Sequence, residues 1–107
     1  MPAVTCDGTE GFMNEKKIER MLVNEVKKRG GLAPKFTSPG FDGVPDRMIL
    51  LPEGHIGFVE LKRSGEKMRP LQMRRKRQFE ALGFSVYCVD SEEQISKVLV
   101  EIGGDAR

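Results

Sequence analysis

The sequence contains very little histidine or cysteine, which limits the chemistry available to it. His55 is the only histidine, and it follows Pro-Glu-Gly in a turn that we expect to be exposed, so a histidine general base is not expected. Cys6 and Cys88 are too few and too far apart for a disulfide framework or a zinc site. We therefore expect a reducing, cytoplasmic environment and regard Cys88 as a core residue.

Long apolar runs and a strong net charge are also missing. No stretch of about 18 apolar residues is present, so we expect no membrane span. The N-terminus lacks the basic and apolar blocks of a secretory signal. With 107 residues, 38% apolar and 32% charged, the chain fits one domain with a modest core and a polar surface. A net charge of +2 does not by itself indicate nucleic acid.

The order of the patterned segments predicts an α/β fold. Residues 1–13 mix Pro, Gly, Thr and Asp without periodicity and are interpreted as a flexible tail, and 14–104 as one domain. The domain pattern predicts, in chain order, a helix (14–29), an edge strand (32–36), strands (46–51 and 56–62), a helix (70–82), a strand (84–89) and a final helix ended by Gly103-Gly104. The expected apolar stripes are Leu71, Phe79 and Leu82 on the second helix and Ile95, Val98, Leu99 and Ile102 on the last.

The central hairpin gathers charged residues at one end. Side chains alternate along a strand, so Glu60 and Lys62 share one face. If the turn is centred between residues 53 and 54, Asp46 lies across from Leu61. It then lies diagonally beside Glu60 and Lys62, at about 5 Å. Two carboxylates and one ammonium therefore converge.

Such a cluster suits a divalent cation. Two neighbouring carboxylates repel each other, and Mg²⁺ binds one or two carboxylates while keeping waters that substrate phosphate can replace. A nearby lysine can orient the attacking water or stabilise charge on phosphorus. A Glu-x-Lys pattern is also common on solvated sheet faces, and Asp42 is a rival to Asp46 for the metal.

A glutamate in the first predicted helix is a third acidic candidate. Glu19 falls inside the apolar stripe that begins at Ile18, whereas Glu25 falls near its edge. A carboxylate in a buried stripe needs a metal or a basic partner, and both interpretations remain open. Glu15 also falls in the stripe, but in the first turn, where the helix dipole explains it.

The segment after Glu60 is strongly basic. Residues 62–77 carry eight positive charges and a single negative one, Glu66. Such clusters are typical of proteins that bind the phosphate backbone, although a solvated helix face is the alternative. The segment has few aromatic residues for base stacking, which favours recognition of DNA shape over sequence.

Three motifs together resemble the PD-(D/E)XK nucleases. They are Gly43-Val44-Pro45-Asp46, Glu60-Leu61-Lys62 and Gln72 after the basic linker. More narrowly, the pattern is similar to the virus-type replication–repair nuclease branch (VRR-NUC), found in small stand-alone phage and bacterial proteins and in a large Fanconi-associated repair nuclease. The resemblance covers about residues 18–99. It implies a restriction-endonuclease-like α-β-β-β-α-β-α core with a mixed sheet flanked by helices.

The resemblance also implies a function and a site. The function is divalent-metal-dependent cleavage of DNA, branched or duplex, in replication, repair or recombination, inside a bacterial or phage-infected cell. Mg²⁺ or Mn²⁺, with no organic cofactor, would be held by Asp46, Glu60 and the helix-borne Glu19. Lys62 would position the nucleophilic water and Gln72 would support it. A homodimer is expected. The candidate DNA contacts are Lys35, Arg63, Lys67, Arg69, Arg74, Arg75 and Arg77.

Two other functions remain open. A non-catalytic nucleic-acid-binding domain would use the same basic segment and would bind in a salt-sensitive way without metal. A sequence-specific restriction-type enzyme would need an additional recognition element, for which a chain of this length has little room unless a dimer supplies it.

Overall fold

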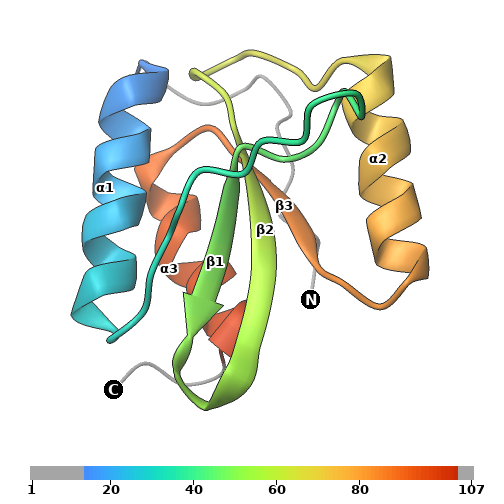
Figure 1. Ribbon diagram of the computed structural model, residues 1–107. Helices are drawn as coiled ribbons and strands as arrows, with labels where there is room; N and C mark the ends of the chain where they lie inside the picture. Colours follow the sequence, from blue (N-terminus) through green and yellow to red (C-terminus); the bar gives the residue numbers. More distant parts are fainter. Residues whose placement is uncertain (1–13, 104–107) are drawn as a thin grey trace.

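The computed structural model describes residues 14–103, and the expected tail, Cys6 and Gly104 lie outside this range. The helices are α1 (Glu15–Lys28), α2 (Pro70–Ala81) and α3 (Glu92–Gly103). The strands are β1 (Arg47–Leu51), β2 (His55–Leu61) and β3 (Val86–Val89), with a 3₁₀ turn, η1 (Pro52–Gly54), between the first two. The expected α/β fold is therefore present, with one strand fewer than expected (Figure 1).

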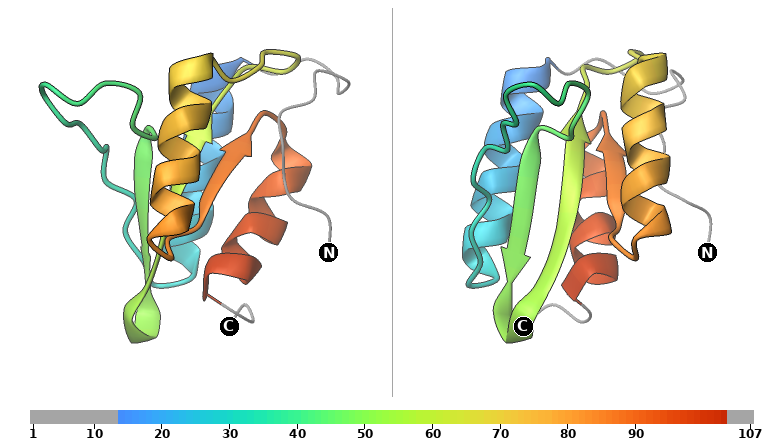
Figure 2. Two further views of the ribbon diagram at one scale, coloured as in Figure 1. Left: turned by 90° about the vertical axis from the view of Figure 1, so that its right-hand side faces the viewer. Right: turned by 45° about the vertical axis from the view of Figure 1, so that its right-hand side comes forward.

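The three strands form a mixed sheet in the order β1-β2-β3. β1 pairs with β2 antiparallel and β2 pairs with β3 parallel. Helices α1 and α3 cover one face of the sheet, which Figure 2 shows in its left view. The core between these layers is apolar; it contains Ile18, Leu22, Val26, Ile49, Leu51, Val59, Leu61, Val89, Ile95, Val98, Leu99 and Ile102.

The hairpin register differs by one residue from the expected one. Arg47 pairs with Val59, whereas a turn centred between residues 53 and 54 would pair it with Glu60. The turn is instead the three-residue η1, in which Glu53 adopts a positive φ of 71°. A shift by one residue exchanges the faces of a strand relative to its partner. The expected register places Asp46 opposite Leu61. Continued by one residue, the observed register places Asp46 opposite Glu60, so the two carboxylates lie on the same face of the hairpin.

The segment over 32–36 lies where an edge strand was expected, but it is not a continuous strand. Leu32 and Leu50 exchange backbone hydrogen bonds of 2.9 and 2.8 Å, and the Phe36 N–H donates to the Asp46 carbonyl at 2.8 Å. Between these points the Pro34 carbonyl accepts from Met48, but proline has no N–H to donate in return. The ladder is therefore reduced to two isolated bridges.

Helix α2 buries less of its apolar side than expected. Leu71 is 40% exposed and Leu82, just beyond the helix, is 76% exposed, so the predicted stripe is wrong at these two positions. Phe79 does pack inward, with its ring centroid 5.1 Å from Phe58 and 6.2 Å from Phe36. Helix α2 is thus attached to the sheet mainly through this aromatic cluster and through polar contacts at its N-terminal half.

The other helices match their sequence signals. The Asn14 side chain caps α1 by accepting from the Lys17 N–H at 2.8 Å. Gln94 accepts from the Ser91 N–H at 3.1 Å at the start of α3, and the predicted α3 stripe is buried. His55 is exposed as expected. Cys88 is buried, as expected for a core residue. No helix in the described range is long and apolar enough to cross a membrane.

Candidate active site

Four segments that are distant in sequence meet at one end of the molecule. β1 begins there and β2 ends there, so Asp46 and Glu60 come together. The first turns of α1 and α2 lie at the same end, at the top of Figure 1. The site is therefore assembled from the hairpin and two helix N-termini.

Glu60 is the more deeply buried of these two carboxylates, at 2% exposure. Its Oε2 atom accepts a 2.6 Å hydrogen bond from the Gln72 side-chain amide and lies 3.4 Å from the Lys62 ammonium. Its Oε1 atom is buried and has no hydrogen-bond partner among residues 14–103. A buried carboxylate oxygen without a partner is costly, so this atom is suited to bind a cation.

Asp46 is held in place by the strand beside it. Its Oδ2 atom accepts from the Leu61 N–H at 2.8 Å, and its carbonyl accepts from Phe36. The chain reaches Asp46 through Gly43, whose φ of 88° favours glycine. The Gly-Val-Pro-Asp motif thus places the aspartate beside the last residue of β2. The rival Asp42 lies on the exposed loop before Gly43.

Burial and neighbouring negative charge make both carboxylates harder to ionise. Burial, followed by the charge of Asp46, raises the pKa of Glu60 to about 7. Burial also raises the pKa of Asp46, although the Leu61 N–H and the Lys62 ammonium act in the opposite direction. A bound divalent cation would offset both burial and repulsion and keep both groups ionised.

Lys62 and Gln72 both contact the Oε2 atom of Glu60. Lys62 is 5% exposed, and its backbone N–H donates to the Val89 carbonyl at 2.9 Å, which continues the β2–β3 pairing. Gln72 accepts from the Arg69 N–H at 2.9 Å through its side-chain oxygen. That bond leaves the amide nitrogen pointing at Glu60. Gln72 therefore contacts the carboxylate directly.

Glu19 has a basic partner. Its Oε2 atom accepts from Arg47 Nε at 3.0 Å and from Arg47 Nη2 at 2.8 Å, while Arg47 Nη1 donates to the Ala33 carbonyl at 2.7 Å. The charge of Glu19 still contributes to raising the pKa of Asp46. Glu25 is away from the hairpin end and pairs with Lys28 and Arg29.

Glu15 is an acidic neighbour of the site that the sequence did not single out. Burial, the charge of Asp46 and the charge of Glu66 raise its pKa, while Lys62 lowers it. The charge of Glu15 in turn contributes to the raised pKa of Glu60. The signal was present in the sequence, because Glu15 lies in the apolar stripe of α1, but its place in the first turn suggested only a dipole effect.

The basic residues fall into two groups. The side chains of most are exposed; these are Lys35, Arg63, Lys67, Arg69, Arg74 and Arg77. Arg75 and Lys76 are half-buried, and both have partners within the chain. Lys76 pairs with Glu80 at 2.7 Å, and Arg75 Nε donates to the Asp42 carbonyl at 2.7 Å.

The residues fit a divalent cation with two protein carboxylates. Within residues 14–103, no three histidine, cysteine, aspartate or glutamate side chains are grouped closely enough to hold an ion together. Mg²⁺ commonly takes only one or two carboxylates and fills its other positions with water and substrate phosphate. The partnerless Glu60 Oε1 atom and the neighbouring Asp46 match that donor set.

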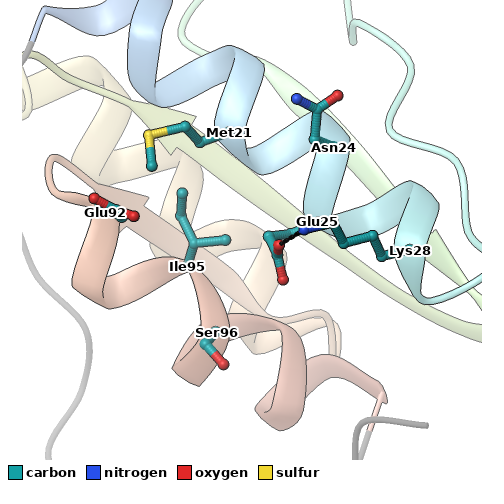
Figure 3. A pocket seen from close by; sticks show the side chains of 7 residues that line it. All are labelled: Met21, Asn24, Glu25, Lys28, Glu92, Ile95 and Ser96. Atoms are coloured by element: carbon teal, nitrogen blue, oxygen red, sulfur yellow. Dashed lines mark hydrogen bonds and ion pairs between the residues drawn. The ribbon is translucent and has the colours of Figure 1, made fainter.

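A pocket elsewhere on the molecule contains none of the predicted site residues. It lies between α1 and α3, as Figure 3 shows. Its lining residues are Met21, Asn24, Glu25, Lys28, Glu92, Ile95 and Ser96. The candidate site is thus a convergence of side chains at the end of the hairpin and is separate from this pocket.

Comparison with known proteins identifies the family. No family model matches the chain. A protein of Acyrthosiphon pisum secondary endosymbiont phage 1, named "Putative nuclease p44", is 49% identical over 88 residues, which cover 82% of this chain and 94% of that protein. A solved structure described as a VRR_NUC domain is 34% identical, with a TM-score of 0.74 over 81% of this chain and 94% of its own. The chain belongs to the VRR-NUC family of nucleases.

The VRR-NUC assignment agrees with the resemblance in the motifs. Both similarities cover most of the described domain, including the hairpin. The TM-score also confirms the fold class, a small mixed sheet flanked by helices. The role of each side chain in this VRR-NUC protein depends on its hydrogen bonds, its burial and the charges beside it.

Proposed function

We propose that this protein is a divalent-metal-dependent endonuclease that hydrolyses DNA phosphodiester bonds. One observation carries the proposal. Glu60 is a buried carboxylate with one oxygen held by Gln72 and Lys62 and the other without a partner among the described residues. Asp46 shares its face of the hairpin and raises its pKa. This is the arrangement expected of a metal ligand in a metal-free chain.

Asp46 and Glu60 would hold Mg²⁺ or Mn²⁺, with Glu15 or Glu19 contributing negative charge nearby. The ion, when bound, supplies charge stabilisation on the scissile phosphate and lowers the pKa of water. The protein's part is to keep both carboxylates ionised and fixed. The Leu61 N–H fixes Asp46, and Gln72 and Lys62 fix Glu60.

Lys62 would act on the attacking water. Its ammonium is almost fully buried and lies 3.4 Å from Glu60 Oε2, so it is restrained to the site. An ammonium donates hydrogen bonds and accepts none. Lys62 would therefore orient the water through its oxygen and stabilise negative charge that develops in the transition state.

Exposed basic side chains around the site would bind the DNA backbone. Arg63, Lys67 and Arg69 lie on the linker from β2 to α2, next to the carboxylates in sequence, and Arg74 and Arg77 are exposed on α2. Phosphate contacts position a protein without reading sequence. We therefore favour selection of DNA by its shape, such as a branched junction. A homodimer would place one site on each of two strands.

A cleavage assay tests the proposal. The purified protein is incubated with labelled linear duplex, flap and four-way-junction DNA of shared sequence, in Mg²⁺, Mn²⁺, Ca²⁺ or EDTA. We expect cleavage in Mg²⁺ or Mn²⁺ only, and faster on a branched substrate. Asp46→Asn and Glu60→Gln should abolish cleavage while DNA binding in Ca²⁺ persists.

Two results would contradict parts of the proposal. Binding without cleavage in every metal would favour a non-catalytic binding domain. Equal cleavage of linear and branched DNA would remove the shape selectivity but keep the nuclease. Light scattering of the protein alone and with junction DNA tests the homodimer.

A further inference from the structure

Arg75 is the basic residue of α2 that is most engaged with the rest of the chain. Its Nε atom donates to the Asp42 carbonyl at 2.7 Å, and its guanidinium carbon lies 3.8 Å from the centroid of the Phe41 ring. Its Nη1 atom donates to Gln78 Oε1 at 2.9 Å. Stacking on an aromatic face and donation in the plane together use the shape of a guanidinium, which lysine cannot reproduce.

The loop held by Arg75 also packs tightly against α2. A Cβ atom added to Gly43 would lie 2.7 Å from Leu71 Cγ and 3.2 Å from Arg75 Cγ. Gly43 therefore allows the loop backbone to approach the helix. The segment before β1 crosses the sheet towards the start of α2, as Figures 1 and 2 show. The same loop ends at Asp46, three residues after Gly43 and directly before β1.

Arg75 and Gln72 lie on the same side of α2. Residues three apart in a helix are neighbours on its surface. Gln72 contacts Glu60 on β2, and Arg75 contacts the loop that leads to Asp46 on β1. One side of α2 therefore connects to both carboxylates of the site.

We propose that Arg75 is a positioning residue that holds the 41–43 loop against α2 and so sets Asp46 relative to Glu60. It acts through this loop and does not contact DNA phosphate. The proposal rests on the proposed nuclease function. Arg74 and Arg77, which neighbour Arg75 in sequence, are exposed and keep the role of candidate phosphate contacts.

The test compares Arg75→Ala and Arg75→Lys with Lys76→Ala. Lys76→Ala is a matched control, because it removes one positive charge at the next position of the same helix, where Lys76 pairs with Glu80. Four measurements are made: the kinetics of DNA cleavage (kcat and KM), Mn²⁺ affinity, the salt dependence of DNA binding, and amide exchange of Phe36 and Leu61. Those two amides donate to Asp46 and report on its position directly.

We expect both Arg75 variants to lose about tenfold or more in kcat, because small misplacements of reacting groups are costly. Mn²⁺ affinity should fall and the Leu61 amide should exchange faster, while KM and the salt slope stay near wild type. Arg75→Lys should resemble Arg75→Ala, because it keeps the charge but not the planar contacts. Lys76→Ala should match wild type in all four measurements.

A different pattern would overturn the proposal. If Arg75→Ala weakens DNA binding with a shallower salt slope, if Arg75→Lys restores it, and if Leu61 exchange is unchanged, Arg75 is a phosphate contact. If the wild-type protein cleaves no DNA in any metal, the nuclease proposal fails instead. The amide exchange then decides the positioning role alone, with unchanged exchange in Arg75→Ala counting against it.

Discussion

The Gln72 side-chain amide donates a 2.6 Å hydrogen bond to Glu60 Oε2, so a residue at the start of α2 fixes one oxygen of a buried carboxylate on β2. The Lys62 ammonium lies 3.4 Å from the same oxygen. Glu60 Oε1 is thereby left as the atom available to a cation. In the proposed site, Gln72 would therefore act by orienting Glu60 as a metal ligand.

Replacement of Gln72 should reveal that orienting role. Partners that orient metal ligands typically contribute 10–100-fold to metal affinity or activity. We expect Gln72→Ala to lower kcat by about 10-fold or more and to raise the Mn²⁺ concentration for half-maximal activity, with little change in KM for DNA. Met73→Ala, at an exposed neighbouring position, is the control. Wild-type metal dependence in Gln72→Ala would show that Glu60 needs no such partner.

Glu60 should make the metal-free protein less stable as pH rises. Its pKa in the folded chain is about 7 against an ordinary 4.5, so folding favours the protonated form. The penalty for ionising the buried carboxylate is absent below the ordinary pKa. It grows as pH rises and reaches about 3 kcal/mol above pH 7, because each pH unit between the two pKa values is worth about 1.4 kcal/mol.

Urea unfolding in EDTA measures this effect. We expect Glu60→Gln to unfold at nearly the wild-type free energy at low pH and to be the more stable protein, by about 2–3 kcal/mol, at pH 8. Glutamine does not titrate, so the difference in unfolding free energy between the two proteins reports the ionisation of Glu60 and not that of Asp46. Added Mn²⁺ should stabilise wild type and leave Glu60→Gln nearly unchanged. A wild-type advantage at pH 8 in EDTA would contradict the raised pKa.

The sequence predicted features that depend on local chemistry. The helix α1 and the buried stripe of α3 each depend on residues within a few positions of one another. The hairpin was predicted for the same reason. Its register was not, because it depends on η1, where Glu53 adopts a positive φ that non-glycine residues seldom take.

Features that depend on distant partners were not predictable. The ion pair between Glu19 and Arg47 joins residues 28 positions apart, so the pattern of α1 alone could not separate a metal ligand from an ion pair. The exposure of Leu71 and Leu82 depends on which other segments cover them, and the pattern of α2 alone does not contain that information. The contacts of Arg75 with Phe41 and Asp42, which belong to a remote loop, distinguish it from its basic neighbours on α2.

Glu15 and Glu19 should differ in what their removal changes. Glu15→Gln removes a charge that interacts with both Asp46 and Glu60, so we expect Mn²⁺ affinity to fall with little loss of stability. Glu19→Gln weakens the pairing of Arg47 and should lower the free energy of unfolding by about 1–3 kcal/mol. Glu25→Gln, which is away from the site, is the control. A larger loss of metal affinity in Glu19→Gln than in Glu15→Gln would assign the ligand role to Glu19.

The exposed arginines of α2 should bind backbone phosphates. Removing one arginine that neutralises a phosphate makes the slope of log affinity against log salt shallower by about 0.9, so Arg74→Ala/Arg77→Ala should reduce it by roughly 1.8. Affinity should fall by a similar factor on two unrelated sequences of the same shape, because phosphate contacts carry no base information. Binding is measured in Ca²⁺.

The matched control for that pair is Lys27→Ala/Lys97→Ala, which removes two exposed charges from α1 and α3. It changes net charge equally, so any slope change that it shares with the arginine variant reflects overall charge rather than contact. An unchanged slope in the arginine variant alone would place this side of α2 away from DNA. A loss of affinity on one sequence but not on the other would mean that these arginines read bases, because a contact to phosphate cannot distinguish two sequences of the same shape.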